Sequence, residues 1–347
     1  MKGTKILKIV LDGFGSYLGM EKGCYIVRDR EGNFQRYPQF EQEIGEVVLK
    51  SGNFVSVGAL ASLAFWEIDC LILTRKGRPV AVLKNLEDDS HVRTRICQYE
   101  ALKNGKGVEI AKQIVLAKIK GQNQTLEKHG LKPRRSLTFV EGRINGIGSE
   151  DLRYVRRRLL GIEGSTYFKQ IFRLFRMRPQ YRKTFKAYDG MNNIFNLVYT
   201  LLEWKVYRAV LKAKLEPYLG FLHSEQFGKP SLVCDLMELY RYLADDFLIQ
   251  YCGKLKLSKK DFVMKRESFS KRRKGQREYL NDSLTKDLMR DFYAYLEGRV
   301  EVPRIRHGSK QTLETLINEE ALLLAKYLRN ERKTWIPRIT GTVLSEL

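Results

Sequence analysis

Two kinds of hydrophobic pattern divide this chain. The first part holds short runs rich in Val, Ile and aromatic residues, separated by turn signals that contain Gly, Asp or Asn, and such runs are typical of β-strands. The small apolar run over 58–66 predicts one short helix between them. The strands that we expect cover residues 6–11, 24–30, 34–38, 45–51, 68–75 and 79–84. This set is large enough for a small β-sandwich over residues 1–85.

The hydrophobic period changes at Asp88, after which apolar residues recur at helical spacing. Pro217 marks the end of one long helix, and Pro230 is placed to begin another, since proline suits the first helical turn. Residues 85–90 form the predicted linker. The clearest helices are expected over 189–215, 230–252, 278–297 and 309–332. The predicted fold class is therefore α+β, with a β-sandwich domain over 1–85 and a larger all-α domain over 86–347.

The net charge of the chain indicates which class of molecule it binds. The 347 residues include 63 Lys and Arg against 40 Asp and Glu, a formal charge of +23, and a bias of this size favours a polyanion, with nucleic acid ahead of an acidic membrane. No apolar run approaches a membrane-spanning length, and no signal-peptide pattern opens the chain, so we expect a cytoplasmic protein without a membrane partner. The five cysteines form no CxxC pair, which favours reduced thiols over a disulfide framework or a structural zinc site.

Three residues suggest a divalent metal site: Glu163, His223 and Glu238, with Asp235 beside the last. Glu163 is the only acid between Leu152 and Lys183, a stretch that holds ten Lys and Arg, and the surrounding cations favour its ionised form. His223, Asp235 and Glu238 lie together in the segment GFLHSEQFGKPSLVCDLMELYR. Carboxylates with one imidazole suit Mg²⁺ or Mn²⁺ better than zinc. A metal within so basic a chain points to chemistry on a phosphodiester.

Spacing alone leaves this site open. Asp235 and Glu238 are three residues apart and share one helix face, and the loop that carries His223 can fold back over the start of that helix. The alternative is structural: Glu238 pairs with Arg241, three residues on, and His223 is a satisfied buried histidine. Structural ion pairs also concentrate charge, so spacing does not decide between the two.

Two basic segments are candidates for contacts with nucleic acid. Residues 254–278 carry eleven Lys and Arg against three acids, and the cluster Lys271, Arg272, Arg273 and Lys274 beside Gly275 predicts a mobile loop that contacts phosphates. Arg153, Arg156 and Arg157 recur at helical spacing before Glu163, where they can steer a phosphate toward it. The alternative in both cases is an ordinary solvated surface.

These segments together resemble the CRISPR-associated integrase and endonuclease family, Cas1, the catalytic half of the spacer-acquisition pair. The resemblance runs over almost the whole chain. It is carried by SGNFVSVGALASLAFWEIDCLILTRKGRPVAVL, VRTRICQYEALKNGKGVEIAKQIVLAKIKGQNQTL, GIEGS, YDGMNNIFNLVYTLLEW and LGFLHSEQFGKPSLVCDLMELYR. The last three are specific in combination, because the ordered set Glu, His, acid is hard to match by chance.

The resemblance implies an N-terminal β-sandwich, a helical catalytic domain and a homodimer formed through the sandwiches. It further implies that Glu163, His223 and Glu238 hold Mg²⁺ or Mn²⁺, with Asp235 at a further acidic position of the motif. Asn192 and Asn193, in GMNN, are assigned to site support or DNA contact. The last ligand is Glu where some members have Asp, which changes its reach by one methylene.

The expected function is insertion of short foreign DNA into a CRISPR array by metal-dependent transesterification, with nicking of branched DNA when water replaces the 3′-hydroxyl. The implied partners are double-stranded and branched DNA, a second copy of the chain and the small protein Cas2. Two alternatives remain at this point: a structure-selective nuclease acting in DNA repair or on RNA, and a DNA-binding scaffold without catalysis.

Overall fold

The structure is a computed structural model that describes residues 7–39, 44–66, 68–75, 77, 79–83, 92–148, 151–163, 166–184, 187–270, 273–300 and 311–339. The chain divides into two compact units, Met1–Ser90 and His91–Leu347. The linker predicted over 85–90 lies outside the described residues.

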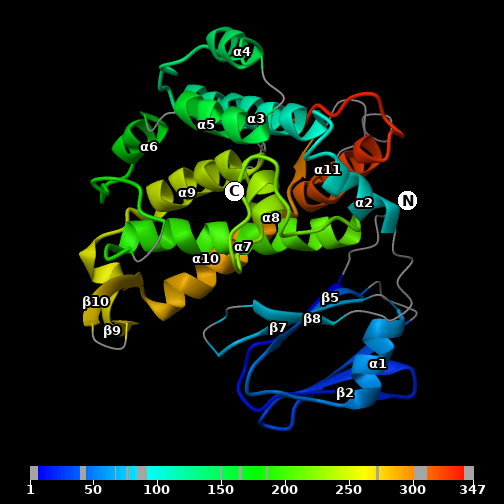
Figure 1. Ribbon diagram of the computed structural model, residues 1–347. Coiled ribbons are helices and arrows are strands. Elements are labelled where there is room, and N and C mark those ends of the chain that lie inside the picture. Colours follow the sequence, from blue (N-terminus) through cyan, green and yellow to red (C-terminus); the bar gives the residue numbers. More distant parts are fainter. Residues whose placement is uncertain are drawn as a thin grey trace. The chain divides into compact units, whose positions relative to one another are not determined.

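The first unit contains two four-stranded sheets (Figure 1). One has the order β1 (Leu7–Leu11), β5 (Ile44–Lys50), β7 (Asp69–Leu73) and β8 (Pro79–Leu83), with only the last pair antiparallel. The other has the order β4 (Phe34–Pro38), β3 (Cys24–Arg28), β2 (Tyr17–Glu21) and β6 (Phe54–Val55). The sequence pattern did not reveal β2 and β6. The glycine and exposed Glu21 in β2, and the two-residue length of β6, give too weak a strand signal.

One core joins both sheets and the short helix of the first unit. Val47 of the first sheet, Leu18 and Tyr25 of the second and Leu63 of α1 (Val57–Phe65) are fully buried in the same apolar cluster. The helix begins where predicted because the Ser56 hydroxyl accepts a hydrogen bond from the Ala59 N–H. The predicted β-sandwich is confirmed.

The second unit is mostly helical (Figure 1). Its described helices are α2 (Val92–Glu100), α3 (Lys106–Lys128), α4 (Leu137–Asn145), α5 (Leu152–Glu163), α6 (Thr166–Ile171), α7 (Gly190–Lys212), α8 (Ser231–Met237), α9 (Arg241–Leu255), α10 (Asp282–Leu296) and α11 (Leu313–Leu328). The long α7 packs against α8, α9 and α11 and supplies much of the core. Asp189 begins α7 by accepting a hydrogen bond from the Asn192 N–H.

The helix predicted over 230–252 is wrong as one element. It is interrupted at Glu238–Tyr240, where each N–H bonds to a carbonyl three residues back. All residues from Leu236 to Tyr240 are buried, including Glu238. A single amphipathic helix buries only one stripe, so the tightened turn is what brings successive side chains into the core.

The basic segment over 254–278 is also different from its prediction. It holds a β-hairpin of β9 (Phe262–Ser270) and β10 (Arg273–Leu280), and α10 therefore starts later than expected. Phe262 and Leu280 are paired and buried at the hairpin base. With β11 (Arg299–Val300) and β12 (Gln311–Thr312), the second unit is mainly rather than entirely helical. Lys271 and Arg272, between the strands, lie outside the described residues.

Candidate metal and DNA site

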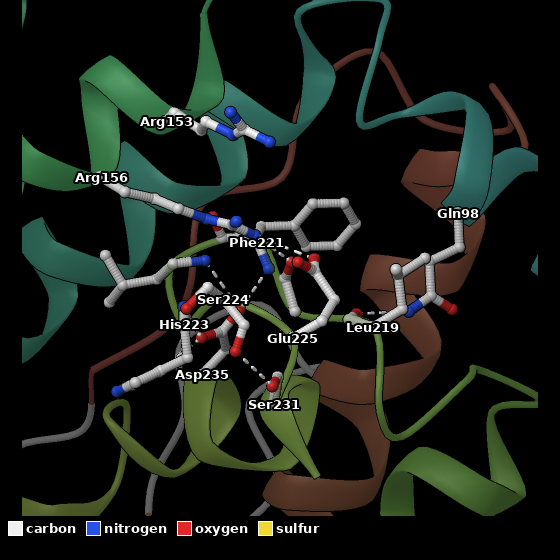
Figure 2. A network of polar contacts seen from close by, with 12 residues as sticks. Gln98, Arg153, Arg156, Leu219, Phe221, His223, Ser224, Glu225, Ser231 and Asp235 are labelled. Carbon is white, nitrogen blue, oxygen red and sulfur yellow. Dashed lines mark hydrogen bonds and ion pairs between the residues drawn. The ribbon is translucent and has the colours of Figure 1, made fainter. Parts of the chain in front are cut away.

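The centre of the candidate site is the buried carboxylate of Asp235 in α8. Its Oδ2 accepts the backbone N–H groups of Phe221 at 2.5 Å and Leu222 at 2.9 Å, and its Oδ1 accepts the N–H of His223 at 2.8 Å. The same Oδ1 lies 2.7 Å from the His223 ring Nδ1 (Figure 2). Asp235 therefore folds the preceding loop onto the start of α8 and fixes the imidazole.

Three further contacts hold this loop. Arg156 of α5 donates from Nε to the Phe221 carbonyl at 2.8 Å and from Nη2 to the Gly220 carbonyl at 2.6 Å (Figure 2). Ser231 Oγ donates to the Ser224 carbonyl at 2.9 Å. A Cβ on Gly220 would lie 2.8 Å from the His223 carbonyl oxygen, so only glycine fits there. The loop is therefore tied at both ends.

Arg156 was expected to steer phosphate, but two of its guanidinium nitrogens donate hydrogen bonds to backbone carbonyls of the His223 loop. The carbonyl partners of Arg156 come from residues about 65 positions away, which helical spacing along the sequence does not indicate. Arg153 and Arg157, the other two predicted cations of α5, are exposed. Their side chains remain accessible to a ligand.

Glu238 lies at the end of α8 and is only 2% exposed. Arg241 Nη1 is 2.5 Å from Oε1, and Lys118 Nζ of α3 is 3.0 Å from Oε2. Burial would raise the pKa of Glu238, but the charges of Arg241, Lys118 and His223 together lower that pKa to about 2. The predicted pairing with Arg241 is present, and Glu238 is an ionised acceptor. The sequence analysis did not predict Lys118 as a partner of Glu238. Its position between Ala117 and Ile119, both of which are buried, was the available signal that this lysine faces the interior.

The donor set agrees in part with a divalent metal. Because Nδ1 of His223 bonds to a carboxylate, Nε2 is the ring nitrogen left to bind a metal, which is the usual arrangement around histidine ligands. Glu163 is the last residue of α5, and its side chain lies outside the described part of the structure. Within that part, no group of three or more His, Cys, Asp and Glu side chains is placed to hold a metal ion. A complete site from these residues therefore requires the Glu163 carboxylate.

A small basic hollow lies along α5, close to its Glu163 end. It has a volume of about 140 Å³ and is lined by Arg143, Ile147, Arg157, Arg158, Gly161 and Ile162. The two isoleucines are buried and form an apolar floor, while the three arginines are exposed. Such a hollow combines apolar contact with cations that can meet phosphate oxygens. Sequence spacing had indicated Arg157 but not Arg143 of α4 or Arg158 of α5.

Asn192 and Asn193 have structural partners. Asn192 accepts from the Lys183 N–H at 2.9 Å and donates to the Tyr181 carbonyl at 3.0 Å. Asn193 donates to the Glu278 carbonyl in β10 at 2.7 Å. These amides fasten the segment before α7 and the base of the hairpin, so they support neighbouring basic elements.

A second buried carboxylate links α9 to the segment that follows Glu163. Asp245 accepts hydrogen bonds from the hydroxyls of Tyr199 at 2.7 Å and Tyr167 at 2.9 Å. Burial raises the pKa of Asp245 to about 6, although the two tyrosine hydroxyls oppose the rise. Arg241 lies over the Tyr199 ring at 5.3 Å from its centroid. The network therefore extends from Glu238 through Arg241 to α6.

No helix in the described part of the chain combines the length and apolar character needed to cross a membrane.

Comparison with known proteins places this geometry in a family. The family model of the CRISPR associated protein Cas1 matches residues 9–291. A relative from Pyrobaculum aerophilum, named CRISPR-associated endonuclease Cas1 2, is 29% identical over 72% of this chain and 84% of its own length. A relative from Thermus thermophilus, CRISPR-associated endonuclease Cas1 3, is 26% identical over 93% of this chain and 94% of its own.

Solved structures share the fold. A casposase bound to integration product matches with a TM-score of 0.76 at 20% identity, covering 95% of this chain and 92% of its own. A Cas1 protein from Thermotoga maritima matches with a TM-score of 0.69 at 20% identity, covering 93% and 97%. Since the family model spans most of the sequence, and since the sandwich-then-helices fold agrees with it, this chain belongs to the CRISPR-associated protein Cas1 family.

Proposed function

We propose that this protein is a metal-dependent DNA endonuclease and integrase that inserts short foreign DNA into a CRISPR array by phosphodiester transesterification. The observation that carries the proposal is the His223–Asp235 pair beside the ionised Glu238, inside a strongly basic chain. Relatives named endonucleases and a casposase bound to integration product support the same chemistry.

Each residue has a defined task in this proposal. Asp235 orients the imidazole, so that Nε2 of His223 faces the ligand side. Arg241 and Lys118 keep Glu238 ionised, and Glu163 supplies the third donor. A bound Mg²⁺ or Mn²⁺ would polarise a phosphoryl oxygen and steady the attacking and leaving oxygens. The protein needs no nucleophile of its own, because the 3′-hydroxyl of the incoming DNA attacks.

The DNA path runs over the exposed cations near α5. Arg153 and the hollow lined by Arg143, Arg157 and Arg158 lie on or beside this helix. Lys271, Arg272, Arg273 and Lys274, in the basic segment over 254–278, add a second set of phosphate contacts. These contacts position DNA but carry no sequence information. Selection of the target repeat therefore requires other contacts.

The proposed assembly is a homodimer that joins Cas2. In the first unit Phe14, Phe54, Val57 and Val80 expose between 64% and 80% of their surface, and we assign these exposed apolar side chains to the dimer contact. A Cas6-RT-Cas1–Cas2 complex shares the fold at a TM-score of 0.66 and 18% identity, which supports Cas2 as the further partner. A cytoplasmic location follows from this role.

The decisive experiment supplies a short duplex with free 3′-hydroxyls, a plasmid that carries a CRISPR repeat, and Mn²⁺, with and without Cas2. We expect covalent joining of the duplex to the plasmid, which is lost with EDTA and in Glu163→Ala. Cleavage of branched DNA without joining on any target would favour a repair nuclease. Equal DNA binding with and without Mn²⁺, with all strands intact, would show a scaffold.

A further inference from the structure

Phe227 is the most exposed large apolar residue in the described part of the chain. Its accessible surface is 110% of the reference value for phenylalanine, so no neighbouring residue covers it. It lies four residues after His223, in the loop that precedes α8. Its neighbours Ser224, Glu225, Gln226 and Gly228 are exposed and polar or small.

A tight turn places the ring at the tip of this loop. Gln226 and Lys229 form an antiparallel bridge, and the Lys229 N–H donates to the Gln226 carbonyl at 3.0 Å. Gly228 has φ +71°, a left-handed conformation that glycine adopts without strain. Phe227 is therefore the first central residue of the turn, where its side chain projects away from the body of the protein.

The base of the loop is rigid, which makes this exposure a property of the fold. His223 is bonded to Asp235 through both its N–H and its ring, and Ser231 Oγ closes the loop on the Ser224 carbonyl at 2.9 Å. Four residues reach at most about 14 Å. This corresponds to roughly four nucleotide steps along a DNA strand, so the ring acts close to any phosphodiester that meets His223.

We propose that Phe227 stacks on a nucleobase of the target DNA and holds the duplex open beside the phosphodiester that is attacked. This inference rests on the proposed integrase function. A nucleobase presents a flat π-face to a single aromatic ring, and aromatic wedges between base steps unstack and kink duplexes. A protein partner instead requires a contiguous apolar patch, and the polar residues around Phe227 do not provide one.

The test compares Phe227→Ala with Phe227→Trp, which keeps an aromatic face. The matched control is Phe139→Ala, which removes a phenylalanine that is 52% exposed on α4. The metal-free readout is the fluorescence of 2-aminopurine placed near the target phosphodiester, which rises when the base leaves the stack. We expect the wild type, Phe227→Trp and Phe139→Ala to give this rise on binding, and Phe227→Ala to lose it.

Strand transfer is then measured on a fully paired target and on one with two mismatched pairs at the same position. Phe227→Ala should be at least about tenfold slower on the paired target, the loss of one stacked base, and should recover to near the wild-type rate on the mismatched target. An unchanged rate on the paired target overturns the proposal. An equal loss of rate on both targets in Phe227→Ala also overturns it, because that result indicates a distorted loop. A normal fluorescence rise in Phe227→Ala together with loss of the dimer or of Cas2 binding overturns it as well, because that result indicates a protein contact.

The mismatched target separates this inference from the integrase proposal. Wild-type strand transfer that His223→Ala abolishes on that target supports the integrase function, whatever Phe227→Ala does. If no variant or wild-type protein joins DNA on either target, the proposed function fails. The fluorescence comparison still decides whether Phe227 opens DNA.

Discussion

Asp235 Oδ1 accepts two hydrogen bonds from His223, one from its backbone N–H at 2.8 Å and one from its ring Nδ1 at 2.7 Å. A carboxylate oxygen only accepts, so the ring proton of a neutral imidazole lies on Nδ1. Nε2 then carries the lone pair, which is what a metal ligand requires. One buried side chain therefore sets both the position and the tautomer of the histidine.

Asp235→Asn tests this relationship. The amide keeps the shape, but its NH₂ group replaces one of the two accepting oxygens, so either the Phe221 and Leu222 N–H groups or the two His223 donors lose their acceptor. We expect activity to fall by roughly 10–100-fold and the free energy of unfolding to fall by about 1–3 kcal/mol. Strand-transfer kinetics and urea unfolding measure the two effects. The control is Glu225→Gln in the same loop, where the carboxylate is exposed and 3.4 Å from Arg156, and it should behave as wild type.

Glu163→Ala, His223→Ala and Glu238→Gln should each abolish strand transfer and cleavage while DNA affinity stays near or above wild type. Removal of a carboxylate from a basic surface reduces its repulsion of phosphate, but the metal loses a ligand. Gln is chosen for Glu238 because its amide oxygen keeps one hydrogen-bond acceptor beside the partly buried Lys118 and Arg241, whereas Ala would remove both acceptor oxygens. Double variants should lose no more than single ones. Full Mn²⁺-dependent activity in Glu163→Ala would contradict the site.

Asp245→Asn should change the pH dependence of stability. The pKa of Asp245 is raised from 3.8 to about 6 in the folded protein, so the folded state holds a proton that the unfolded state releases at lower pH. Wild-type stability is then lost as pH rises from about 4 through about 6, by an amount on the order of 3 kcal/mol. Urea unfolding at pH 5 and pH 8 should show a larger fall for the wild type than for Asp245→Asn. Equal falls in both proteins would rule out Asp245 as the titrating group.

Replacement of Lys271, Arg272, Arg273 and Lys274 by Ala should weaken DNA binding and flatten its salt dependence. Each lost phosphate contact removes about 0.9 from the slope of log K against log salt, so the slope falls by up to about 3.6. Fluorescence anisotropy from low to high salt measures it on two unrelated sequences, which should respond alike. Arg332→Ala with Lys333→Ala removes two exposed charges elsewhere as a control. An unaltered slope would show that these four residues do not contact phosphates.

Phe54→Asp combined with Val57→Asp should convert the homodimer to a monomer. The two side chains are 66% and 80% exposed on either side of the cap that begins α1, and a buried charge at an interface is costly. Light scattering of the full chain measures its molar mass in solution and so distinguishes a dimer from a monomer. Phe139→Asp in the second unit should remain dimeric. A dimer that survives the double change places the contact on another surface.

The sequence by itself determined the elements whose pattern is local. Short runs rich in Val, Ile and aromatic residues between turn signals predicted most strands of the sandwich, and helical spacing with Pro217 predicted α7 nearly to its ends. Charge and the ordered set of Glu163, His223 and Glu238 pointed to DNA and a metal, because those signals need only residue identity. The hairpin at 262–280 was not predicted, because its many charged residues leave no clear apolar pattern typical of strands.

Tertiary structure decided the partners of each charged group. No local pattern shows that Lys118 reaches Glu238 across 120 residues, or that Arg156 serves two carbonyls of the His223 loop. Nor does spacing show the break at Glu238, which arises because every residue from Asp235 to Tyr240 enters the core. Burial removes water as a partner, so each buried charge must find one within the protein. Only the folded chain determines which residue supplies it.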